Sequence, residues 1–195
     1  MFRIPLLVAL ALTVAFGLGT FSAIEALKVT LGFGGITLGP WTAFPQAQTA
    51  DADPYAKAHR ARAGALLLGG AEGLVFYART DSKGMPLDAG CTYEISGQTP
   101  AARFWTLHVT GPDDRPFSLD AGLPTAINSW TVLRRADTAF TVALSRKAQP
   151  DNWVALPEQG RFALVLTLLD TPTAGSSGVM ELEMPAIVTT GCGDA

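Results

Sequence analysis

Residues 104–110 read FWTLHVT, and this stretch indicates the fold class of the chain. Trp105, Leu107 and Val109 alternate with polar residues, which is the pattern of a β-strand that buries one face. Because successive side chains of a strand point to opposite faces, one ring of the neighbouring pair Phe104 and Trp105 is expected inside and the other exposed.

The same alternation recurs on both sides of this stretch. Residues 91–95, 140–144 and 180–184 each alternate apolar with mostly polar side chains, and each predicts a strand with one buried face. The nearly continuous apolar runs 74–78 and 162–169 suit central strands. Turn sequences rich in Gly, Pro, Asp and Ser separate them. About seven short strands without helices between them predict a mainly β, antiparallel sandwich or jelly-roll-like domain.

The amino-terminal part of the chain has a different character. Ile4 to Ile24 form 21 consecutive residues without a charged side chain. A helix of that length is roughly 31 Å long, which matches the hydrocarbon core of a bilayer. The alternative is a cleaved signal peptide, but the small-residue context at 20–23 places a Phe inside the cleavage site. We therefore expect a permanent anchor that contacts the lipid bilayer through residues 4–24.

The organisation of the chain follows from this anchor. Residues 1–30 are expected to be the transmembrane segment, 31–52 a juxtamembrane linker with Trp41 at the membrane interface, and 53–195 the β domain. Asp53 and Pro54 have the residue types of a helix start, which predicts a short helix over about residues 53–68. The positive charge of Arg3 favours a cytoplasmic amino terminus. The body is therefore expected to face the periplasm or cell exterior from a single pass through the inner membrane.

Charge and cysteine content restrict the function further. Residues 51–195 have a net charge of −4, which argues against nucleic acid as a partner. The chain has two cysteines, Cys91 and Cys192, and an extracytoplasmic body would favour a disulfide between them over two unpaired thiols. Two cysteines and two histidines without ligand spacing give no metal site, and we expect no cofactor.

Few residues suggest reaction chemistry. His108 has the character of a general base on the exposed face of its strand, with Asp81 or Glu94 as carboxylate candidates, but nothing local identifies a nucleophile. Aromatic and basic side chains are the better indication of a binding surface. The candidate surface residues are Tyr77, Arg103, Trp105, His108 and Trp153.

The order of short motifs resembles a known bacterial family. Gly39-Pro40-Trp41, Cys91-x-Tyr93-x-Ile95-x-Gly97, Ala102-Arg103-Phe104-Trp105 and Asn152-Trp153 follow one another at the spacing of domain of unknown function 1214, in its short, membrane-anchored form. The activity of that family is not established. Its relatives are often fused to, or encoded beside, a sister domain of unknown function 1254, so the resemblance implies a protein partner in the envelope.

Two functional hypotheses of different classes result, beside a third option of a purely structural envelope protein with no specific ligand. The first is a non-catalytic, membrane-anchored envelope domain that binds a partner protein or ligand through its β-sandwich. The second is a hydrolase-like envelope enzyme that uses His108 with a carboxylate. An acid–base pair in a cleft would favour the enzyme, and an isolated His108 on an open face would favour the binding domain.

Overall fold

The computed structural model describes residues 3–29, 35–45, 47, 49–50, 52–63, 68–117, 119–120, 122–172 and 182–193. The chain divides into two compact units, which are considered separately. The first unit comprises residues 1–34 and 50–66, and the second comprises residues 35–49 and 67–195.

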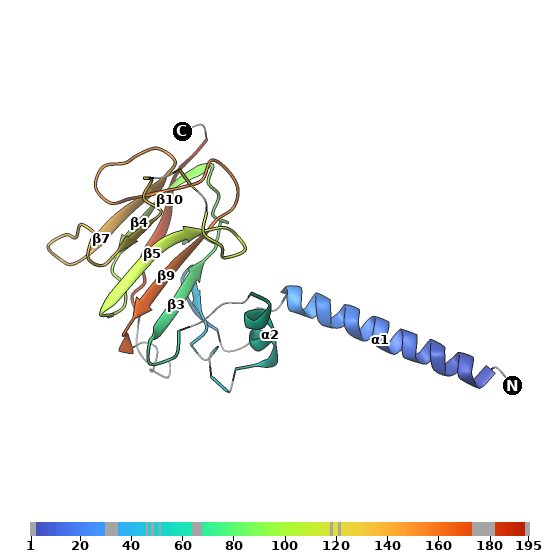
Figure 1. Cartoon of the computed structure of the whole chain (residues 1–195). Helices are drawn as coiled ribbons and strands as arrows, with labels where there is room; N and C mark the ends of the chain where they lie inside the picture. Colours follow the sequence, from blue (N-terminus) through green and yellow to red (C-terminus); the bar gives the residue numbers. More distant parts are fainter. Residues whose placement is uncertain are drawn as a thin grey trace. The chain divides into compact units, whose positions relative to one another are not determined.

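The described residues of the first unit form two helices, α1 (Arg3–Val29) and α2 (Pro54–Ala63) (Figure 1). Within α1, the 24 residues Arg3–Ala26 are long and apolar enough to cross a membrane. At the start of α2, the Asp53 carboxylate accepts hydrogen bonds from the backbone N–H groups of Tyr55 and Ala56 at 2.8 and 3.2 Å, as expected of an N-cap. The predicted helix start is therefore confirmed. The described part of α2 reaches Ala63 and residue 68 is not helical, but residues 64–67, where the predicted helix end falls, lie outside the described residues.

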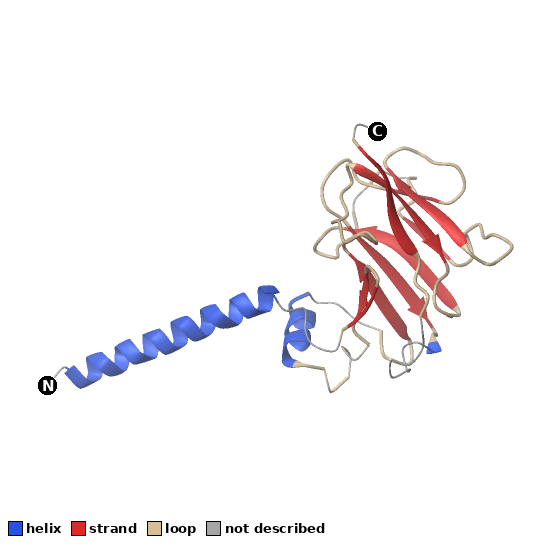
Figure 2. Cartoon of the chain, turned by 180° about the vertical axis from the view of Figure 1, so that it is seen from behind, coloured by secondary structure: helices blue, strands red, loops and turns tan. Residues whose placement is uncertain are grey.

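The second unit is a two-sheet β domain, so the predicted fold class is confirmed (Figure 2). One sheet has the strand order β1-β2-β3-β9-β5-β6 and the other β10-β4-β7-β8. All neighbouring strands are antiparallel except β7 and β8, which are parallel. The strand bounds are β1 Ile36–Leu38, β2 Trp41–Ala43, β3 Gly73–Ala78, β4 Cys91–Gly97, β5 Phe104–Thr110, β6 Ala126–Asn128, β7 Phe140–Ser145, β8 Trp153–Ala155, β9 Ala163–Leu169 and β10 Ala186–Cys192.

The core lies between the two sheets, and alternation along each strand determines which residues fill it. In β5 the side chains of Trp105, Leu107 and Val109 are at most 3% exposed. The apolar run of β9 lies between β3 and β5, which confirms that it is a central strand. Residues of both sheets join one hydrophobic cluster, among them Phe76, Ile95, Trp105, Phe140, Leu144, Leu166 and Ile187.

The expected linker differs from the structure. Residues 36–43 form the β1–β2 hairpin, which adds to the edge of the six-stranded sheet. Trp41 is fully buried in the core, and its indole N–H donates a hydrogen bond to the Pro185 carbonyl at 2.8 Å. The expectation that Trp41 lies at the membrane interface was therefore wrong. The two strands have only three residues each, and the chain turns between them at Gly39, which has a positive φ of 59°. Strands this short show no alternation of apolar and polar residues, so the sequence did not predict them.

The last strand also begins later than predicted. Residues 182–184 of the expected strand are not in a strand, and residues 180–181 lie outside the described part. The strand β10 starts after Pro185, which lacks the N–H group that a sheet ladder requires. Met184 packs against the core from outside the strand.

The turn at Asp81 holds β10 in place. Asp81 is 3% exposed, and its carboxylate accepts hydrogen bonds from the backbone N–H groups of Lys83 and Met85 and from the Thr189 hydroxyl on β10. Burial alone would raise the pKa of this carboxyl, but the hydrogen bonds and the Lys83 charge hold the pKa below its usual value. Ser82 exchanges hydrogen bonds with the backbone of Ile187, so it occupies part of the free edge of β10.

Candidate functional site

The outer face of the six-stranded sheet brings together two of the predicted surface residues. Tyr77 on β3 and His108 on β5 both lie opposite Val165 on the central strand β9. Their neighbours along the strands, Phe76 and Leu107, are at most 1% exposed and point into the core, so Tyr77 and His108 point outward. Val165 between them is only 5% exposed. These three residues form a continuous row across three strands.

An ion pair lies beside Tyr77. The Arg79 guanidinium contacts the Asp114 carboxylate at 2.6 Å, and its central carbon lies 5.5 Å from the centre of the Tyr77 ring. Burial raises the pKa of the Tyr77 hydroxyl, and the Asp114 charge raises it further, although Arg79 opposes the rise. Both side chains of the pair are 42% exposed, so this ion pair contributes little to the stability of the fold. It holds the Arg79 guanidinium beside the Tyr77 ring.

His108 has no acid–base partner in the part of the chain that the structure describes. No carboxylate among these residues forms a hydrogen bond or ion pair with its imidazole. Burial lowers the pKa of the His108 imidazole, because a partly buried site disfavours the charged form of the ring. The candidate carboxylates are elsewhere, because Asp81 supports its own turn and Glu94 is exposed on the other sheet.

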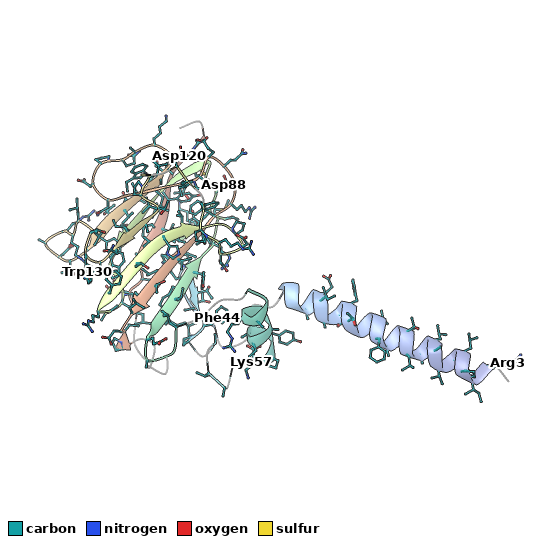
Figure 3. The ribbon with its side chains drawn as sticks, in the orientation of Figure 1. Arg3, Phe44, Lys57, Asp88, Asp120 and Trp130 are labelled. Atoms are coloured by element: carbon teal, nitrogen blue, oxygen red, sulfur yellow. A yellow bond between two sulfur atoms is a disulfide. The ribbon has the colours of Figure 1, made fainter. Side chains whose placement is uncertain are left out.

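Two aromatic rings lie at one end of the same outer face. Phe104, at the start of β5, packs edge-on against Trp130, with ring centres 4.8 Å apart. Trp130 is 83% exposed (Figure 3). The Asn128 side-chain oxygen accepts hydrogen bonds from the backbone N–H groups of Trp130 and Thr131 at 2.9 and 3.2 Å, which fixes the turn that carries the Trp130 ring. We call Phe104 and Trp130 the aromatic pair.

The other predicted surface residues are dispersed. Trp105 is 2% exposed in the core, so its assignment to the surface was wrong: Phe104, not Trp105, is the outward ring of the two. Arg103 precedes β5, and its exposed guanidinium lies 3.7 Å from the Asp170 carboxylate. Trp153 lies on the outer face of the four-stranded sheet, opposite Ala143, and its indole N–H donates to the Ser145 carbonyl at 2.9 Å.

The aromatic pair was missing from the surface predicted from the sequence. The available signal was the dipeptide Phe104-Trp105 itself, because the alternation that buries Leu107 and Val109 also buries Trp105 and exposes Phe104. Trp130 lies in a turn after β6, where no alternation of apolar and polar residues indicates that its side chain is exposed. Its place beside Phe104 depends on the pairing of β6 with β5.

The two cysteines meet across the edge of the four-stranded sheet. Cys192 on β10 lies directly opposite Cys91 on β4, and their sulfur atoms are at disulfide-bonding distance. Among the described residues, no three His, Cys, Asp or Glu side chains come together in a group that could hold a metal ion.

Comparison with known proteins gives a family and a fold. The family model described as "Protein of unknown function (DUF1214)" matches residues 72–173. The structure resembles the VPA0106 protein from Vibrio parahaemolyticus with a TM-score of 0.61 and 20% sequence identity, over 89% of this chain and 43% of that one. A putative uncharacterized protein from Burkholderia cenocepacia aligns with a TM-score of 0.38 and 16% identity, over 74% of this chain and 45% of that one. The chain thus spans less than half the length of either protein. No curated protein matches the sequence.

Proposed function

This chain belongs to the family of proteins of unknown function DUF1214, and on that premise we propose that it is a membrane-anchored envelope protein that binds a protein partner. The helix α1 holds it in the inner membrane by a single pass, and the β domain faces the periplasm. Binding uses the outer face of the six-stranded sheet, from the row of Tyr77 and His108 to the aromatic pair.

The exposed Trp130 is the observation that carries this proposal. An indole that is 83% exposed leaves a large apolar surface in water, and the contact with Phe104 and the turn at Asn128 hold it in one position. Trp, Tyr and Arg are the residue types that contribute most to protein–protein binding energy, and a fixed ring loses little entropy on binding. The outer face presents all three types, in Trp130, Tyr77 and Arg79.

A photoreactive amino acid at position 130 tests this surface. In intact cells, position 130 is expected to yield one envelope-protein adduct of defined mass, and position 94, which is exposed on the other sheet, is expected to yield none. With the purified partner, Trp130→Ala should weaken binding about 30-fold, which corresponds to truncation of a residue worth about 2 kcal/mol. Equal adducts from both positions, or none from position 130, would contradict the proposed surface.

The membrane anchor and its orientation are tested separately. Alkaline phosphatase fused to the carboxyl terminus is expected to be active, because this enzyme folds only after export. The fusion protein should also stay with the membranes through a carbonate wash, because a predominantly apolar span of 24 residues does not leave the bilayer as peripheral proteins do. An inactive fusion would reverse the orientation, and release by carbonate would remove the anchor.

A further inference from the structure

The helix α2 has a charge opposite to that of the β domain. Its ten residues, PYAKAHRARA, include Lys57, Arg60 and Arg62 with His59 and no acidic residue. Residues 68–195 contain nine basic and fourteen acidic side chains, a net charge of −5. Positive charge is therefore concentrated in one short helix of a chain that is otherwise acidic.

This basic helix adjoins the apolar one. Helices α1 and α2 belong to the same compact unit and contact each other. Figure 1 shows α2 beside the carboxyl-terminal end of α1, and Figure 3 shows Lys57 on α2. The Lys57 side chain is exposed, and its ammonium group donates a hydrogen bond to the Ala50 carbonyl at 2.8 Å. If α1 spans the bilayer as proposed, a helix at its carboxyl-terminal end lies at the level of the lipid headgroups.

From this placement, and resting on the proposed membrane span, we infer that α2 binds the phosphate groups of anionic phospholipids where α1 leaves the bilayer. Each Lys or Arg close to an anionic membrane surface strengthens association about fivefold, so three of them give roughly a hundredfold preference. The interaction extends about one Debye length, so it should weaken strongly at high salt. The acidic β domain has the opposite sign and is repelled by the same surface.

The reactivity of Lys57 tests this inference in the full-length protein. The chain is reconstituted into lipid nanodiscs that contain phosphatidylcholine alone or about 30% phosphatidylglycerol, and lysines are acetylated and followed by mass spectrometry. Lys83 and Lys147, which are exposed on the β domain, serve as internal controls. We expect acetylation of Lys57 to slow about fivefold on the anionic discs. The two control lysines should react alike on both discs, and about 1 M salt should abolish the difference at Lys57.

Variants with Arg60→Gln and Arg62→Gln should lose most of the protection at Lys57 while the chain stays in the discs. Equal acetylation of Lys57 on both kinds of disc would overturn the inference and indicate a solvated helix. Equal slowing of all three lysines would also overturn it, because shielding would then not be specific to α2. Failure of the membrane span gives a different result, because the chain would then leave the discs whatever their lipid composition.

Discussion

Replacing both Cys91 and Cys192 by Ser should lower the free energy of unfolding by about 4 to 5 kcal/mol. The bond closes a loop with a sequence separation of 101 residues, and a loop of this size restricts the unfolded chain strongly. It also fastens the edge strand β10 to β4 at the last pair of their ladder. Urea unfolding of the full-length protein in detergent, with and without reductant, measures the loss.

The double variant provides its own control. Reductant should shift the wild-type midpoint toward that of the double variant and leave the variant unchanged. Ile187 is fully buried, and the Thr189 hydroxyl donates a hydrogen bond to the Asp81 carboxylate. We therefore expect β10 to remain in place in the reduced protein at low urea concentration. The disulfide does not form if both cysteines of the purified, unreduced protein are alkylated and reductant leaves the urea unfolding midpoint of the wild-type protein unchanged.

The sequence was most informative where strands are long enough to show a period. Alternation over residues 104–110 and 140–144 identified both the strands β5 and β7 and the side chains that fill the core. A strand of three residues contains too few side chains to establish alternation. For this reason β1, β2, β6 and β8 were not predicted, although β2 contributes the fully buried Trp41.

The candidate site depends on pairings that the order of the sequence does not reveal. Tyr77 and His108 were each recognised as surface residues, but they lie in one row only because β9, from the far end of the chain, inserts between β3 and β5. The aromatic pair likewise depends on the β5–β6 pairing. Local patterns therefore predicted which side chains face outward better than which of them are neighbours.

Replacing Trp41 by Ala should lower the free energy of unfolding by about 4 kcal/mol, the second large effect that we expect. The substitution removes a fully buried indole and leaves a cavity beside β3. It also leaves the Pro185 carbonyl without its hydrogen-bond donor. Trp41→Phe keeps most of the apolar volume and should lose about 1 to 3 kcal/mol through the missing N–H donor. Urea unfolding of the full-length protein measures both variants.

Trp130→Ala is the matched control, because it removes the same type of side chain from a position that is 83% exposed, and it should change the free energy of unfolding by less than about 1 kcal/mol.

The comparison of the two variants also distinguishes between two locations of residues 36–43, in the β domain or in the lipid headgroup region. If the hairpin belongs to the β domain, Trp41→Ala destabilises the domain and Trp41 fluorescence is the same in every lipid. If Trp41 instead lay in the headgroup region, its substitution would leave the unfolding midpoint of the domain unchanged, and brominated lipids would quench its fluorescence. Equal effects of the two Trp→Ala substitutions would therefore place the hairpin outside the core.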